Sequence, residues 1–123
     1  MTGAEMVVGI NGYGRIGRAF HRLSLLDPAI RVAAVNSRSD ADTLGHLLAY
    51  DSVYGELDAD VVARESEFSV AGQPVQVYQE AAPESIPWDR HNIDVVIDAT
   101  GKFKDRDSLA AHLNGSVQHV ILC

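Results

Sequence analysis

Three glycines at a regular spacing are the residues of this sequence best suited to bind an anionic ligand. They form the pattern Gly12-x-Gly14-x-x-Gly17, which follows an apolar run and opens a segment with helical periodicity. We expect Gly12 to permit a tight turn, Gly14 to leave room for a pyrophosphate, and Gly17 to allow close packing of the helix on the strand. The phosphates would then lie on the free N–H groups at the helix start, where the macrodipole places about half a positive charge.

The same spacing also occurs at tight strand-to-helix turns that bind no ligand, so the elements around it decide between the two interpretations. Residues 6–11 are nearly continuous in apolar side chains, as expected of a strand buried on both faces of a parallel sheet. The helix after the glycines ends at Asp27-Pro28 and has an apolar face at Ile16, Phe20 and Leu23. A second strand is expected at 31–36, parallel to the first, because helical crossovers of this length join parallel strands with a right-handed turn.

A second helix and an antiparallel insertion follow the second strand. Ser39 and Asp42 form a capping-box pattern at the helix start, and the apolar face of this helix comprises Leu44, Leu47 and Leu48. After a connection over 51–60 comes the apolar run Val61-Val62-Ala63. The alternation of apolar residues after this run predicts a hairpin around Ala71-Gly72, which pairs Phe68 and Val70 with Val75 and Val77.

The last part of the chain predicts a buried strand at 94–99 and a final strand at 117–122. Between them lies a third helix at 105–113, which Asn114-Gly115 ends. These elements predict one α/β domain over residues 1–123, with a Rossmann-type, mostly parallel sheet, helices on both faces and a small antiparallel hairpin insertion. Such a domain has a strand before the glycines and a helix after them, so we interpret the glycine pattern as a phosphate-binding loop.

Composition narrows the classes of function. The net charge of -7 argues against nucleic-acid binding through a basic patch and against electrostatic attachment to a membrane. A single cysteine, Cys123, excludes an internal disulfide and suits a reducing compartment. Residues 1–5 lack a basic leader pattern and Asn11-Gly12 interrupts the apolar run, so neither a signal peptide nor a membrane span is expected and a cytoplasmic location is predicted. The histidines have no ligand spacing, so no metal site is expected.

Further motifs follow the glycine pattern in the order of the chain. They are Leu44-x-His46-Leu47-Leu48-x-Tyr50-Asp51-Ser52-x-x-Gly55, Ile86-Pro87-Trp88, Ala99-Thr100-Gly101-x-Phe103 and His112-Leu113. With residues 8–18, these motifs resemble the N-terminal part of phosphorylating glyceraldehyde-3-phosphate dehydrogenases. The related erythrose-4-phosphate dehydrogenases share the pattern, and the resemblance runs from about residue 6 to residue 123.

The resemblance implies a site for a nicotinamide dinucleotide. The family's pyrophosphate contacts, made chiefly by backbone N–H groups, fall at the glycine loop, and Thr100 and Gly101 correspond to residues on the nicotinamide side. The full set of expected cofactor-binding residues is Asn11, Gly12, Tyr13, Gly14, Arg15, Ile16, Asn36, Ser37, Arg38, Thr100 and Gly101.

The residues after the second strand bear on the choice between NAD and NADP. The family commonly has Asn-Asp here, whereas this sequence has Asn36-Ser37 followed by Arg38. An aspartate would repel a 2′-phosphate by about 4 kcal/mol at ~4 Å and an effective dielectric near 20. Since the aspartate is absent and Arg38 offers phosphate donors, we predict that NADP is accepted, preferred to NAD or nearly equal to it. The alternative is a solvated loop in which Arg38 points away.

A second departure from the family lies in Glu80-Ala81-Ala82-Pro83, where the family often has Glu-Arg-Asp-Pro. It removes an arginine from the expected adenine-side wall.

The resemblance implies a reaction in which a cysteine thiolate attacks an aldehyde, hydride passes to the nicotinamide and phosphate releases the acyl group. The family's nucleophile lies in a Ser-x-x-Cys-Thr-Thr-Asn motif that this sequence lacks, and Cys123 is not in that context. We therefore expect no catalytic residue here and no aldehyde oxidation by this chain alone.

Three functions stay open at this point. The chain is the coenzyme-binding part of a glyceraldehyde-3-phosphate-dehydrogenase-like oxidoreductase without its catalytic domain, a free-standing NAD(P)-binding or regulatory module, or the coenzyme domain of an erythrose-4-phosphate dehydrogenase. The usual strand order of this fold covers the strand at 117–122 with a sixth strand that this sequence lacks, so we expect 117–122 to form an apolar sheet edge that self-associates or pairs with a partner chain.

Overall fold

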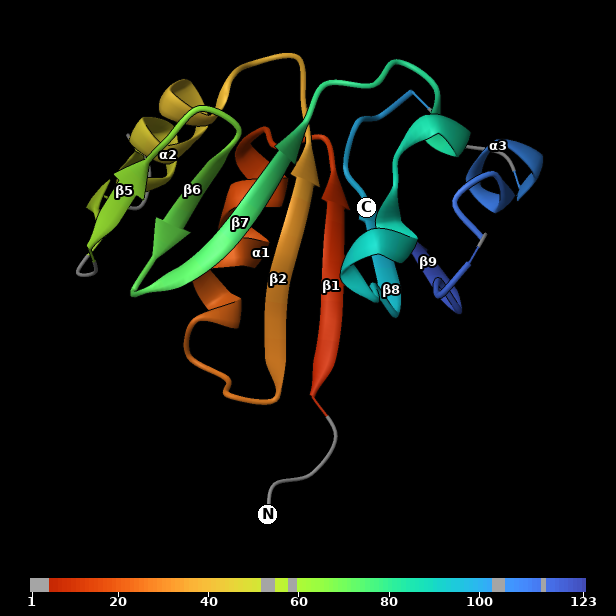
Figure 1. Ribbon diagram of the computed structural model, residues 1–123, viewed down its shortest axis with the longest axis horizontal. Coiled ribbons are helices and arrows are strands. Elements are labelled where there is room, and N and C mark those ends of the chain that lie inside the picture. The colour runs from red at the N-terminus through yellow and green to blue at the C-terminus, as the bar shows by residue number, and fades with distance from the viewer. Residues whose placement is uncertain (1–4, 52–54, 58–59, 103–105, 114) are drawn as a thin grey trace.

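The computed structural model describes residues 5–51, 55–57, 60–102, 106–113 and 115–123. Within them, a seven-stranded sheet has the order β5-β6-β7-β2-β1-β8-β9 (Figure 1). Its strands are β1 (Met6–Asn11), β2 (Ile30–Asn36), β5 (Val61–Ala63), β6 (Glu67–Val70), β7 (Gln73–Tyr78), β8 (Val95–Asp98) and β9 (His119–Leu122). From β7 to β9 neighbouring strands are parallel, whereas β5, β6 and β7 form an antiparallel hairpin insertion. The predicted Rossmann-type sheet is thus confirmed.

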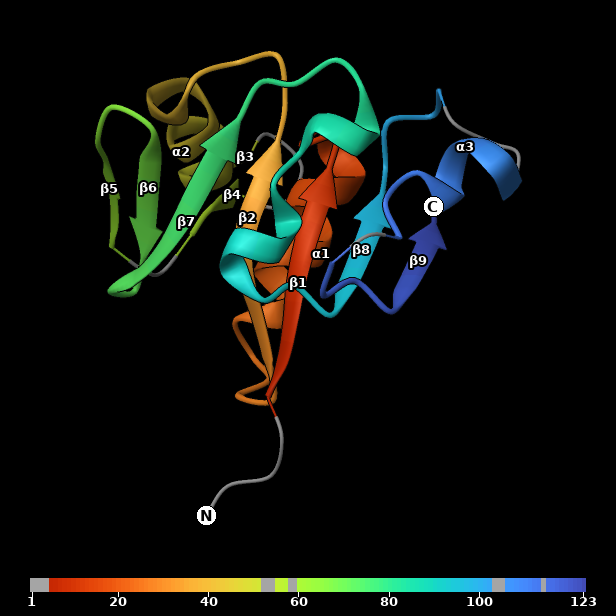
Figure 2. The same cartoon turned by 45° about the vertical axis from the view of Figure 1, so that its right-hand side comes forward.

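Both faces of the sheet are covered. Helices α1 (Arg15–Ser24) and α2 (Ala41–Ala49) lie on one face, and two short 3-10 turns, η1 (Pro83–Ser85) and η2 (Trp88–His91), lie on the other (Figures 1 and 2). A third helix, α3 (Arg106–Ala110), precedes β9. A small antiparallel pair, β3 (Tyr50–Asp51) with β4 (Gly55–Glu56), occupies part of the segment expected to be an irregular connection. None of the described helices is long and apolar enough to cross a bilayer.

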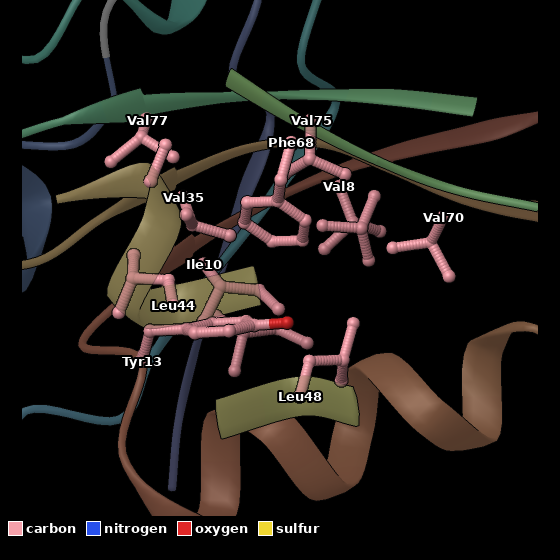
Figure 3. Close-up of a cluster of buried hydrophobic side chains, with 13 residues drawn as sticks. Val8, Ile10, Tyr13, Val35, Leu44, Leu48, Phe68, Val70, Val75 and Val77 are labelled. Atoms are coloured by element: carbon pink, nitrogen blue, oxygen red, sulfur yellow. The ribbon is translucent and has the colours of Figure 1, made fainter. Parts of the chain in front are cut away.

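Each face of the sheet has its own apolar core, because successive side chains of a strand point to opposite faces. On the helix side, valines and isoleucines of β1 and β2 pack with Leu44 and Leu48 of α2 and with Phe68 of the hairpin (Figure 3). On the other side, Trp88 of η2 packs with residues such as Ala33 and Val96. Gly9 of β1 leaves space for this ring, since a Cβ there would lie 2.6 Å from Trp88 Cζ3.

The expected apolar face of α1 is wrong at two of its three residues, whereas Phe20 packs against the core as expected. Ile16 and Leu23 are 57% and 66% exposed, while the residues that face the sheet lie one position later, at Gly17, His21 and Ser24. The close approach of α1 to β1 explains the offset. A Cβ at Gly17 would lie 2.5 Å from the carbonyl oxygen of Gly12, so only a residue without a side chain fits where the helix approaches the loop most closely.

Several predicted boundaries also move. Helix α2 is capped by Asp40 instead of Ser39, because the Asp40 carboxylate accepts a hydrogen bond from the Thr43 N–H at 2.9 Å. That hydrogen bond lowers the pKa of Asp40. Helix α3 ends at Ala110, so Leu113 is not helical, and β9 starts at His119 instead of residue 117. The motif positions 52 and 103, the expected helix start at 105 and the expected stop residue at 114 lie outside the described residues.

Candidate functional site

A pocket of about 400 Å³ lies where the carboxyl ends of the central parallel strands meet. Strand β1 is flanked there by β2 on one side and β8 on the other, so the strand order reverses at this point. Open α/β sheets bind their ligands at such a reversal. The pocket is lined by Asn11, Gly12, Gly14, Asn36, Ser37, Arg38, Gln79, Glu80, Ala81, Ala99, Thr100 and Lys102.

The three glycines differ in what surrounds them. Gly12 has φ +92°, and a Cβ on it would lie 2.8 Å from the backbone nitrogen of Thr100. Gly17 is packed against the Gly12 carbonyl, as described above. At Gly14, by contrast, an added Cβ would meet no atom within 4 Å. The first and third glycines therefore serve the close packing of the loop, and the second opens onto the pocket.

The start of α1 faces the same pocket. The N–H groups of the first turn have no intrahelical acceptor, as in every helix. Gly14 is the N-cap and has no side chain that could accept from them instead. Arg15 and Ile16 are exposed and do not line the pocket, but their N–H groups belong to this first turn. The geometry fits an anion such as a pyrophosphate.

Tyr13 lies in the glycine loop, but its side chain points into the core instead of the pocket. The ring packs beside Ile10, Leu44 and Leu48 (Figure 3), and its hydroxyl forms a hydrogen bond with Nδ1 of His21 on α1. Burial lowers the pKa of His21 to about 4 and raises that of Tyr13 well above its usual value. Tyr13 thus anchors the loop, and only its backbone is available to a ligand.

On the side of the pocket formed by the residues after β2 and β7, a reciprocal pair of hydrogen bonds joins the two segments. The Asn36 side chain donates to the Glu80 carbonyl and accepts from the Glu80 N–H, both at 2.9 Å. In addition, the Gln79 side chain donates to the carbonyl of Arg38 at 3.1 Å. The sequence alone indicated Glu80 and Ala81 only as a departure from the family. It missed Gln79, which follows the end of a strand that the register places beside β2.

Two cationic side chains line the pocket from opposite sides. Arg38 follows β2 and Lys102 follows β8, and neither side chain forms a hydrogen bond or an ion pair with any part of the chain that the structure describes. Arg38 had been predicted, whereas Lys102 was missed because it occupies the variable position of the Ala99-Thr100-Gly101-x-Phe103 motif. Gly101, which was predicted, is not among the lining residues.

A buried carboxylate joins the ends of β1 and β8. Asp98 accepts hydrogen bonds from the backbone N–H and the hydroxyl of Thr100, at 3.1 and 2.8 Å, and from the side chain of Asn11 at 3.1 Å. His112 lies 3.0 Å from the same carboxylate. Burial by itself raises the pKa of Asp98, but these hydrogen bonds outweigh it and lower the pKa overall.

Comparison with known proteins shows which family has this arrangement of strands and glycines. The family described as "Glyceraldehyde 3-phosphate dehydrogenase, NAD binding domain" matches residues 6–106. The chain is 45% identical over 115 residues to the glyceraldehyde-3-phosphate dehydrogenase of Geobacillus stearothermophilus. It is 43% identical over 115 residues to glyceraldehyde-3-phosphate dehydrogenase 1 of Bacillus cereus. Each alignment covers 94% of this chain and 34% of the relative, so the chain spans about a third of the length of these relatives.

Proposed function

Because the chain belongs to the family of glyceraldehyde 3-phosphate dehydrogenase NAD-binding domains, we propose that its pocket binds the nicotinamide dinucleotide of a phosphorylating aldehyde dehydrogenase. One observation carries the assignment of the site. Gly14 lines the pocket at the start of α1, between the ends of β2 and β8, and a Cβ added to it would meet no atom within 4 Å. A ligand therefore has room to approach the backbone there. A pyrophosphate there accepts hydrogen bonds from the first-turn N–H groups, as dinucleotides do in this fold.

The two halves of the dinucleotide extend to opposite sides of the pyrophosphate. The adenosine half lies toward Ser37 and Arg38 after β2, and the nicotinamide half lies toward Thr100 after β8. When bound, the nicotinamide ring supplies the hydride acceptor of the reaction. This chain binds and orients the cofactor, and we assign no catalytic role to the exposed Cys123.

The relatives reported above are named as glyceraldehyde-3-phosphate dehydrogenases, which favours glyceraldehyde 3-phosphate over erythrose 4-phosphate as the aldehyde. A free-standing NAD(P)-binding module stays the alternative. An assay of aldehyde-dependent cofactor reduction in the natural protein distinguishes the dehydrogenase from the free-standing module, since the module binds the cofactor without turnover.

We further propose that NADP is accepted alongside NAD. Ser37 and Arg38 both line the pocket, and the Arg38 guanidinium is exposed to a ligand instead of being paired within the described chain. A guanidinium offers a fork of donors that matches phosphate oxygens. The Glu80 carboxylate lines the same pocket, and its negative charge limits the preference for a 2′-phosphate.

The test is a titration of the protein with NAD+ and NADP+, beside Ser37→Asp and Arg38→Ala. We expect Ser37→Asp to shift the ratio of the two dissociation constants toward NAD by about tenfold or more, which corresponds to ~1.4 kcal/mol. Arg38→Ala should weaken NADP binding selectively. Arg64→Ala is the matched control, because it removes an exposed arginine that does not line the pocket. An unchanged ratio in Ser37→Asp contradicts the NADP proposal, and a wild type that binds neither dinucleotide contradicts the assignment of the site.

The edge of the sheet supports the proposal of self-association. Strand β9 is the last strand of the described sheet, and Ile121 and Leu122 are exposed on it. An unpaired apolar edge offers its backbone groups to a second chain. We expect a mass above that of a monomer in sedimentation at micromolar concentration, and a strictly monomeric mass contradicts it. A cytoplasmic location stays a prediction.

A further inference from the structure

A chain of buried polar side chains runs beneath the pocket and ends at residues that do not line it. Asn36 donates to Asn11 at 2.9 Å, and Asn11 donates to Asp98 at 3.1 Å. His112 and Trp88 continue this chain away from the pocket. Asp98, His112 and Trp88 are each completely buried. Ordinary packing does not require such a series of polar groups, because a core of apolar residues avoids the cost of desolvating them.

The hydrogen bonds on either side of His112 determine where its ring hydrogen lies. The indole N–H of Trp88 can only donate, so Nδ1 of His112 accepts from it at 3.1 Å. Nε2 therefore carries the hydrogen and donates it to Oδ2 of Asp98 at 3.0 Å. Both ring nitrogens are used, and the carboxylate is held in one orientation by a side chain that never reaches the pocket.

The other oxygen of Asp98 determines the position of the pocket wall after β8. Oδ1 accepts from the N–H of Thr100 and from its hydroxyl, and that hydroxyl accepts in turn from the N–H of Lys102 at 3.1 Å. Thr100 and Lys102 both line the pocket, and we call them the nicotinamide-side wall. The opposite wall is tied to β2 by the pair between Asn36 and Glu80, and Asn36 is connected to Asp98 through Asn11, two hydrogen bonds away. A change at His112 thus acts mainly on one wall.

We propose that His112 is a positioning residue for the dinucleotide: through Asp98 it holds the nicotinamide-side wall in the conformation that receives the nicotinamide half. The proposal rests on the proposed function, since it takes the ligand of the pocket to be a dinucleotide. It predicts that losing the His112 hydrogen bonds weakens binding of the whole dinucleotide and spares binding of its adenosine half.

The first test compares His112→Leu with His112→Gln. The leucine removes both hydrogen bonds, whereas the glutamine amide can accept from Trp88 and donate to Asp98. The ligands are the preferred dinucleotide and its adenosine half, AMP for NAD+ or 2′,5′-ADP for NADP+. We expect the leucine variant to lose about tenfold or more in dinucleotide affinity and less than about twofold in mononucleotide affinity, and the glutamine variant to recover most of the loss.

The second test needs no variant, so it holds even where His112→Leu does not fold. Trp88 is the single tryptophan of the chain, which makes its indole N–H resonance a direct reporter of the bond to His112. We expect saturating dinucleotide to shift this resonance and the mononucleotide to leave it in place.

Three results overturn the proposal: equal loss of both ligands in His112→Leu, no loss of either, or an indole resonance that the dinucleotide does not move. A wild type that binds no dinucleotide contradicts the proposed function instead.

Discussion

Substituting valine for Gly14 is expected to leave the chain folded and to weaken dinucleotide binding by about 100-fold or more. An added side chain has room at this position, because a Cβ there meets no atom within 4 Å and the backbone is extended, with φ -83°. That room is the space that we assign to the pyrophosphate. Displacing the phosphates from the first-turn N–H groups removes charge-assisted hydrogen bonds worth about 1.5–3 kcal/mol each, and two of them account for the expected loss.

The measurement pairs calorimetric titration of the dinucleotide with urea unfolding of the same sample. Gly14→Ala is expected to show a smaller loss of affinity, since its side chain is shorter. Gln73→Val serves as the matched control, because it adds a valine at the amino end of β7, the end of the strand opposite the pocket. Wild-type affinity in Gly14→Val means that no ligand approaches the backbone at this glycine.

Substituting alanine for Gly12 is expected to reduce the free energy of unfolding by about 3 kcal/mol or more. Two costs combine at this position. A residue with a Cβ held at φ +92° is strained by about 1–3 kcal/mol, and the Cβ would overlap the Thr100 nitrogen at 2.8 Å, which adds an overpacking cost of about the same size. A side-chain rotation cannot relieve these costs, because the two nearest atoms, the Thr100 nitrogen and the Ala99 carbonyl carbon, belong to the backbone.

Denaturant unfolding of Gly12→Ala and Gly14→Ala side by side checks this expectation. The two variants carry the same substitution two residues apart in one loop, so any difference in stability reports the surroundings of each glycine. We expect Gly14→Ala to stay within about 0.5 kcal/mol of the wild type. Equal stabilities for the two variants contradict the close approach of the Gly12 turn to Thr100.

Much of the framework follows from local patterns. The continuous apolar run at 6–11 predicted β1 with its observed bounds, and the alternation around Ala71-Gly72 predicted the β6–β7 hairpin. The tight turn at Gly12, the open space at Gly14 and the close packing at Gly17 were also predictable, because a strand, a tight turn and a helix in succession leave little choice of conformation. Seven of the expected site residues line the pocket, namely Asn11, Gly12, Gly14, Asn36, Ser37, Arg38 and Thr100.

Where local patterns and tertiary packing disagree, packing decides. The apolar spacing of Ile16, Phe20 and Leu23 indicated the buried face of α1. Phe20 does pack against the core, but the close approach of α1 at Gly17 leaves Ile16 and Leu23 exposed to solvent. Tyr13 was expected at the cofactor because it lies in the glycine loop, and its ring enters the core instead, where His21 binds its hydroxyl.

The sequence by itself therefore determined the strand, turn and helix that form the glycine loop, since these depend on residues close together in the chain. Only the tertiary structure decided which polar residues meet around that loop. Asp98 and His112 are separated by 14 positions, and Asn11 and Asp98 by 87, yet both pairs form hydrogen bonds in the buried series beneath the pocket. The parallel pairing of β1 with β8 brings Asn11 and Asp98 side by side, and no local periodicity encodes that register.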